Sequence, residues 1–95
     1  MHIGALTVKF RLHGLTSIKA KRSIAASLKR KLRNKFNVSV AEVDGQDSTE
    51  ILILAVVTVA NEAKRVDSQL QKAYAMLEAA TSEEIVYFST EIFVG

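Results

Sequence analysis

The sequence has 95 residues, of which 48% are hydrophobic and 24% charged, which is typical of a folded domain. It contains no cysteine, which excludes disulfides and thiolate metal sites. The longest apolar run, residues 51–57, is far shorter than the roughly 20 residues that a membrane-spanning helix needs. We therefore expect one domain over residues 1–95 of a cytoplasmic protein, with no membrane segment, no metal site and no cofactor.

Charge is unevenly distributed along the chain. Residues 1–41 hold ten of the 13 Lys/Arg and no Asp or Glu, so this part carries +10. Residues 42–95 combine three Lys/Arg with ten Asp/Glu and carry −7, which leaves the modest net charge of +3. A division of this size indicates an anionic partner, and the pI near 9.4 lies in the range of nucleic-acid-binding domains.

The first half of the chain predicts a strand followed by a helix. Residues 3–12 alternate in polarity, which predicts a strand whose buried row is Leu6, Val8, Phe10 and Leu12. Gly14 ends the strand, and Thr16 or Ser17 is expected to cap the helix. Apolar side chains then recur every four residues from about residue 17 to 36, beside Ala25, as in an amphipathic helix: Ile24, Leu28, Leu32 and Phe36.

The second half predicts three strands and one helix. Asn37 is expected to end the first helix, and the polar segment 44–48 has turn chemistry. Residues 51–60 are apolar on both faces, which is typical of a central strand. We place strands at 38–43, 51–60 and 85–94, and the second helix from its expected N-cap, Asn61, to about Ala80.

The order βαββαβ predicts a ferredoxin-like α+β fold. In this fold a four-stranded antiparallel sheet has two helices on one face and its first and third strands in the middle. One apolar row of residues 51–60 then points to the face without helices, so we expect a homodimer through that face. The alternative is a monomer in which Lys9, Arg11 and Tyr87 cover this row.

The first helix has cations on nearly every solvent-facing side and no acid. Like charges repel one another there, and a bound phosphate backbone would relieve the repulsion. Cations in the first turn also lie beside backbone N–H groups that favour an anion. The candidate anion- or nucleic-acid-binding residues are Ser17, Lys19, Lys21, Arg22, Lys29, Arg30 and Arg33, with Lys9 and Arg11 extending the surface.

The cations of the first helix are also compatible with two alternatives to a bound nucleic acid. The basic side of the helix is simply solvated, or it meets an acidic protein. Within the protein itself, the cations at the start of the helix are also candidates for an internal salt bridge to Glu42, Glu50, Glu62 or Glu91.

Three segments carry a resemblance to a known family: residues 3–6, the Ser-Ile-Lys-Ala-Lys-Arg-Ser stretch at 17–23, and residues 36–43. They resemble the YlxP-like family of small bacterial proteins, also called domain of unknown function 503, over essentially the whole chain. The resemblance implies the βαββαβ fold; the family has no established activity, so it provides no catalytic residue to carry over. It also implies a gene often found beside those for translation initiation factor two and ribosome-binding factor A. It directs attention to Ser17, Lys19, Lys21 and Arg22.

Enzymatic function is not expected, because no catalytic constellation is visible. His2 and His13 lie at opposite ends of one predicted strand, and the four glycines are isolated from one another. Residues 51–60 contain no aromatic ring on which an RNA base could stack, and Phe10 belongs to the predicted core. We therefore expect a non-catalytic protein that contacts RNA or ribosomal particles by charge. The alternatives are a protein–protein adaptor and a small-ligand-binding regulatory domain.

Overall fold

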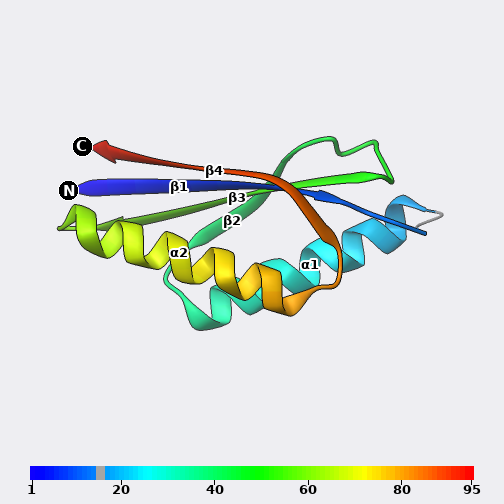
Figure 1. Ribbon diagram of the computed structural model, residues 1–95, viewed down its shortest axis with the longest axis horizontal. Coiled ribbons are helices and arrows are strands. Elements are labelled where there is room, and N and C mark those ends of the chain that lie inside the picture. The colour runs from blue at the N-terminus through cyan, green and yellow to red at the C-terminus, as the bar shows by residue number, and fades with distance from the viewer. Residues whose placement is uncertain (15–16) are drawn as a thin grey trace.

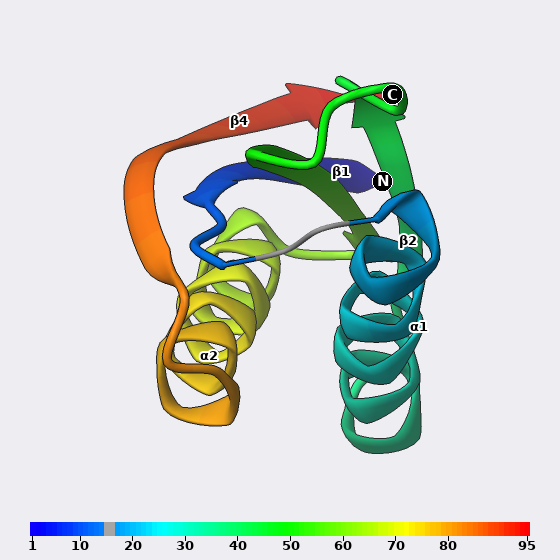
Figure 2. The same ribbon diagram turned by 90° about the vertical axis from the view of Figure 1, so that its right-hand side faces the viewer.

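The computed structural model describes residues 1–14 and 17–95. Its elements follow the order βαββαβ: β1 (His2–Arg11), α1 (Ile18–Lys35), β2 (Ser39–Asp44), β3 (Ile51–Ala60), α2 (Ala63–Ala80) and β4 (Glu84–Val94) (Figure 1). The strands form one antiparallel sheet in the order β2-β3-β1-β4. Both helices lie against one face of the sheet, and the other face is open (Figure 2). The predicted ferredoxin-like α+β fold is confirmed.

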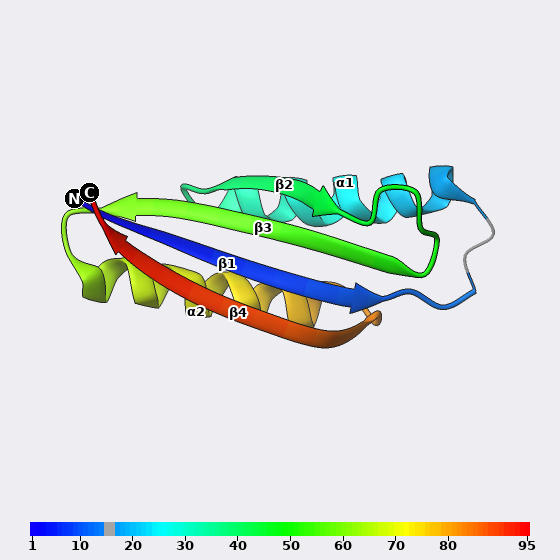
Figure 3. The same ribbon diagram turned by 90° about the horizontal axis from the view of Figure 1, so that it is seen from above.

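The two ends of the chain lie side by side, because β1 and β4 pair along their whole length (Figure 3). His2 is opposite Val94, and Arg11 is opposite Glu84. Beyond the strands, the Gly95 backbone N–H donates a hydrogen bond of 2.9 Å to the Met1 carbonyl oxygen. The register shifts between Lys9 and Phe10, where β4 holds one extra residue.

The core lies between the sheet and the two helices. It is built on alternate residues of β1 and β3, which point toward the helices because successive side chains of a strand point to opposite faces. The predicted row of β1 is buried in full, including Leu12 just beyond the strand. The remaining core side chains come chiefly from β3 and the helices: Leu52, Leu54, Val56, Ala25, Leu28, Leu32, Val66, Leu70, Ala73 and Leu77.

Gly4 marks a close approach between β1 and α2. A Cβ atom at this position would overlap Val66 Cγ1 and would lie 3.0 Å from Leu70 Cδ1. Glycine therefore lets the backbone of β1 approach these two side chains of α2 without displacing them.

The two helices begin in different ways. Ser17 is the N-cap of α1, and its hydroxyl oxygen accepts a 3.2 Å hydrogen bond from the Ala20 backbone N–H. The alternative cap, Thr16, lies outside the described residues. The N-cap of α2 is Glu62, whose side chain makes no capping hydrogen bond, so the prediction of Asn61 was wrong. None of the helices in the described ranges is long and apolar enough to cross a membrane.

The edge strand β4 is the least buried strand. None of its residues is fully buried, although it carries large apolar side chains on both faces. On the helix side, Phe88 packs against Tyr74 of α2, with the ring centroids 4.4 Å apart. On the open side, Tyr87 and Phe93 are exposed.

Candidate nucleic-acid interface

The solvent-facing side of α1 carries cations and no acid. Its apolar stripe, which includes Ala25, Leu28 and Leu32, packs onto the sheet. At 100° and 1.5 Å per residue, the outward cations span an arc of about 100° and a length of about 21 Å. We call this set the α1 basic surface; four members are exposed and Lys29 is half-buried: Lys19, Arg22, Lys29, Arg30 and Arg33.

Arg33 anchors one end of the α1 basic surface to the sheet. One of its terminal nitrogens donates a 2.9 Å hydrogen bond to the Val40 carbonyl oxygen of β2. A guanidinium group has five N–H donors, so this bond leaves others for an external anion.

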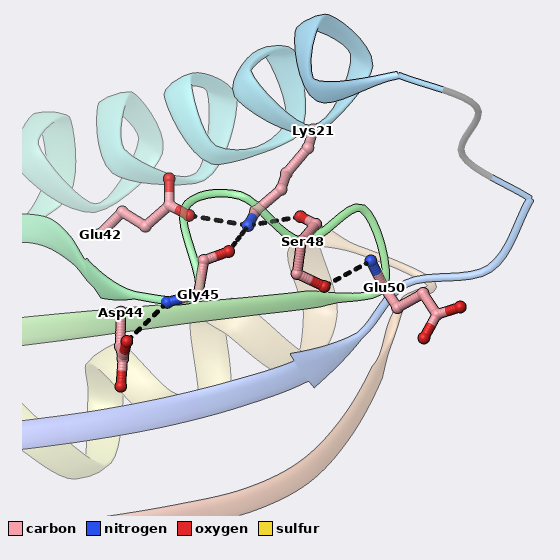
Figure 4. Close-up of polar contacts among 6 residues, drawn as sticks. All are labelled: Lys21, Glu42, Asp44, Gly45, Ser48 and Glu50. Atoms are coloured by element: carbon pink, nitrogen blue, oxygen red, sulfur yellow. Dashed lines mark hydrogen bonds and ion pairs between the residues drawn. The ribbon is translucent and has the colours of Figure 1, made fainter.

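Lys21 lies inside the protein, although it stands in the same motif as Lys19 and Arg22. Its side chain is 1% exposed. The ammonium group donates hydrogen bonds to the carbonyl oxygens of Gly45, at 2.5 Å, and of Ser48, at 2.8 Å (Figure 4). A carboxylate oxygen of Glu42 lies 3.0 Å away. Lys21 therefore does not belong to the exposed surface, and it joins α1 to the β2–β3 loop.

Helix geometry explains the burial of Lys21. It lies one turn before Ala25, on the side of α1 that carries Leu28 and Leu32. The loop also presents its carbonyl groups to the ammonium: Gly45 takes a φ of 68°, and its N–H donates a 2.8 Å hydrogen bond to the Asp44 carboxylate. The position of Lys21 on the apolar side of the helix predicts that it is buried, whereas its residue type alone does not.

The candidate internal salt bridge forms at Lys21, with Glu42 as the acid. Between described residues, Arg65 also pairs with Glu62, and His13 Nε2 lies 3.5 Å from a carboxylate oxygen of Glu84; both contacts are exposed. Within residues 1–14 and 17–95, no member of the α1 basic surface forms an ion pair with a carboxylate of the protein. Its positive charge is therefore not neutralised by these residues.

The other predicted site residues lie elsewhere. The Ser17 hydroxyl caps α1. Lys9 and Arg11 lie on the open face of the sheet, because the alternate residues Val8 and Phe10 fill the core on the opposite face. The structure therefore does not join them to the α1 basic surface.

The open face of the sheet carries aromatic rings on its edge strand. Phe10 is fully buried, as predicted, so β1 and β3 present no aromatic ring there. In β4, however, Tyr87 lies opposite Lys9 and Phe93 lies opposite Ile3. Tyr87 was expected on this face only as a cover for the apolar row, and Phe93 was overlooked, because stacking rings were sought only on the first and third strands.

These observations define the class of protein as a ferredoxin-like domain with a basic first helix. The chain belongs to the family described as protein of unknown function (DUF503), which matches residues 3–90. It is similar to the uncharacterized protein YlxP of Bacillus subtilis strain 168, with 27% identity over 77 residues, 81% of this chain and 84% of YlxP.

Solved structures share the fold at low sequence identity. A Chloroflexus aurantiacus J-10-fl protein named after the antibiotic biosynthesis monooxygenases is 13% identical, with a TM-score of 0.54 over 98% of this chain and 94% of that one. The cofactor-independent oxygenase SnoaB of Streptomyces nogalater is also 13% identical, with a TM-score of 0.53 over 100% and 94% of the two chains. At this identity the likeness concerns the fold alone.

Proposed function

We propose that this protein is a non-catalytic RNA-binding protein whose α1 basic surface contacts the phosphate backbone of a structured RNA, such as that of a ribosomal particle. The observation that supports this proposal is a row of cations along about 21 Å of one helix, none of which is paired with an acid of the described residues. Phosphates along the row relieve the repulsion between neighbouring cations and release counterions.

The chemistry of the surface favours a nucleic-acid backbone over an acidic protein. Three of its five members are arginines, whose planar guanidinium groups match the geometry of phosphate oxygens. The surface has no large apolar side chain between its cations to form the core of a protein interface. The translation genes that the family resemblance implies as neighbours point in the same direction.

A salt titration with a structured RNA hairpin tests the proposal. Fluorescence anisotropy should show an association constant whose logarithm falls with the logarithm of salt concentration, with a slope of about −4 for four to five phosphates of the paired stem. Replacing two exposed members, Arg22→Glu with Arg30→Glu, should weaken binding at least about tenfold and reduce the magnitude of the slope by about 1.8.

The matched control is Lys64→Glu with Arg65→Glu. These exposed residues of α2 give the same change in net charge, and the pair of Arg65 with Glu62 is a surface pair of little energetic weight. The control should bind RNA within about threefold of the unmodified protein. Equal losses of RNA affinity in both variants would mean that binding depends only on net charge. Unchanged affinity in the α1 variant would refute the proposal.

A second candidate function, homodimerisation, is supported by the open sheet face. Val57 is 40% exposed and Val59 is 51% exposed, and Phe93 on the same face is 49% exposed. Val59 and Phe93 lie on either side of Ile3 in the sheet, so three apolar side chains form a continuous row. Lys9 and Arg11, expected to cover the apolar row of β3 in a monomer, lie opposite Ile53 and Ile51 at one end of it, and the other end, Val57 and Val59, stays exposed. We propose that the row, Ile3, Val59 and Phe93 with Val57 beside it, packs against a second copy of the chain.

Sedimentation at tens of micromolar protein tests the dimer. The unmodified protein should sediment as a dimer, and Val59→Lys with Phe93→Lys should sediment as a monomer, because burying the new charges is unfavourable. Val43→Lys with Val86→Lys replaces two exposed valines away from the row and should stay dimeric. A monomeric unmodified protein would contradict this second candidate.

A further inference from the structure

A groove between the two helices has properties that neither proposed function uses. Its larger section, of about 800 Å³, lies between the C-terminal part of α1 and the second half of α2. A smaller section of about 280 Å³ adjoins it at Ala80 and continues along α1 to Ser23. Counted along α1 from Ser23 to Phe36, the groove is about 20 Å long.

The floor of the groove is apolar and its rim is basic. Ile24, Phe36, Met76 and Ala80 are half-buried and form the floor, and beside Met76 the exposed Ala75 and Ala79 give α2 two small side chains on this side. Three exposed lysines form the rim: Lys31 and Lys35 on α1, and Lys72 on α2. Among the described residues, no acid lines either section.

We propose that this groove binds an acidic amphipathic α-helix of a partner protein. The apolar stripe of such a helix would cover the alanine, methionine and phenylalanine side chains, and its flanking Glu or Asp residues would meet the three lysines. Lys31 and Lys35 are one helical turn apart, which matches the spacing of acids at i and i+4 along a helix.

Backbone hydrogen bonding favours a helix over an extended segment. The side chains of the floor are apolar and cannot hydrogen-bond to a peptide backbone. An extended peptide would bring unpaired N–H and C=O groups against them, and these groups are costly to bury without partners. A helix satisfies these groups internally. Small residues such as Ala75 and Ala79 also allow a helix axis to come close to α2. RNA fits less well, because the larger section has one aromatic ring, Phe36, and its floor has no polar side chain for a base edge.

The test uses a synthetic helical peptide of about 18 residues, long enough to span the groove, with leucines at i, i+3, i+4 and i+7 and glutamates beside them. In ¹H–¹⁵N NMR spectra of the full chain, it should cause saturable shifts confined to the groove: Ile24, Lys31, Lys35, Phe36, Lys72, Met76 and Ala79. A peptide with every glutamate replaced by lysine, and a scrambled peptide of the same composition, should bind at least about tenfold more weakly.

Variants of the protein separate the groove from the rest of α1. Lys31→Glu with Lys35→Glu should weaken binding of the acidic peptide about tenfold or more, and Ala79→Glu should do the same by placing an acid beside the floor. Lys19→Glu with Arg30→Glu gives the same charge change as the double lysine variant on the outer side of α1, and should leave the affinity unchanged. All these positions are exposed, and circular dichroism checks that the variants fold.

Several results would overturn the inference. They are the absence of saturable shifts at about 1 mM peptide, shifts centred on the open sheet face or on the outer side of α1, and equal binding of the lysine-substituted or scrambled peptide. An equal loss of affinity in the Lys19/Arg30 variant would also refute it, since that result means a general charge effect. None of these results bears on RNA binding, which is measured separately on the outer side of α1.

Discussion

The two faces of the sheet are formed by the same strands but are buried to different extents. On the helix side of β3, Leu52, Leu54 and Val56 are fully buried, whereas on the open side Val57 and Val59 are 40% and 51% exposed. Most of the hydrophobic stabilisation therefore comes from one face. The other face can change with little loss of fold stability, which leaves it available for binding.

The same contrast occurs on α1 between adjacent residues. Lys21 is buried with its ammonium group bound by the β2–β3 loop, and Arg22 is exposed. Lys21 thus stabilises the contact between α1 and the β2–β3 loop, whereas Arg22 is accessible to a partner. Substituting a buried residue and an exposed residue near it, and comparing the two losses of stability, measures how differently the two positions contribute to the fold.

The largest loss of stability is expected on the core side of β3. Leu54→Ala should lower the free energy of unfolding by about 3 kcal/mol, because it leaves a cavity in the core. Ile53→Ala, on the open face, should lower it by about 1 kcal/mol, because part of the Ile53 side chain already contacts water. Urea unfolding at equal protein concentrations measures both. Equal losses would mean that the open face is as well covered as the core.

The next largest loss of stability is expected at Lys21. Lys21→Met should cost about 2 to 3 kcal/mol, because the Glu42 carboxylate, 17% exposed, and two loop carbonyl groups lose their partner. Arg22→Met should change the stability by less than about 0.5 kcal/mol. Urea unfolding again provides the measurement. If Lys21→Met is as mild as Arg22→Met, the ammonium group does not hold the loop.

A double variant distinguishes the ion pair from the loop contacts. Lys21→Met with Glu42→Leu should be less destabilised than the sum of the two single changes, because it removes both charges together. The remaining loss should correspond to the carbonyl groups of Gly45 and Ser48. Full additivity would show that Lys21 and Glu42 do not interact.

A smaller difference is expected at the close approach of β1 to α2. Gly4→Ala should destabilise the protein by about 1 to 2 kcal/mol, because the new methyl group overlaps Val66 and forces α2 outward. Ala5→Val adds bulk on the open face and should be neutral or slightly stabilising, since valine favours strands. Thermal unfolding measures both, and a neutral Gly4→Ala would mean that α2 adjusts without strain.

The sequence predicted those features that depend on local periodicity. The strand at Ile51–Ala60 has the predicted limits, because its apolar run is bounded by polar residues on both sides. Ser17 was one of two predicted caps and is the observed one. The start of α2 was missed because Glu62 occupies the cap position without making a side-chain hydrogen bond.

The environment of Lys21 could not be predicted in full, for a physical reason. Its partners lie 21 to 27 residues further along the chain, and two of them are backbone carbonyl groups, which have no residue signature. Glu42 was one of four candidate acids, and only the folded chain distinguishes it from the others. The separation of Lys9 and Arg11 from α1 likewise follows from the sheet having two faces.

The smallest difference is expected at the one buried polar residue of β3. Thr58 is 4% exposed, and its hydroxyl donates a 3.1 Å hydrogen bond to the Asn37 carbonyl oxygen, between α1 and β2. Thr58→Val should cost about 1 kcal/mol, because the shape is kept while the carbonyl loses its donor. Val57→Thr, the reverse change on the open face, should cost less than about 0.5 kcal/mol. Hydrogen exchange of amides near residue 37 should accelerate only in the Thr58 variant. If it does not, water replaces the lost donor, and this contact does not fix the end of α1 on the sheet.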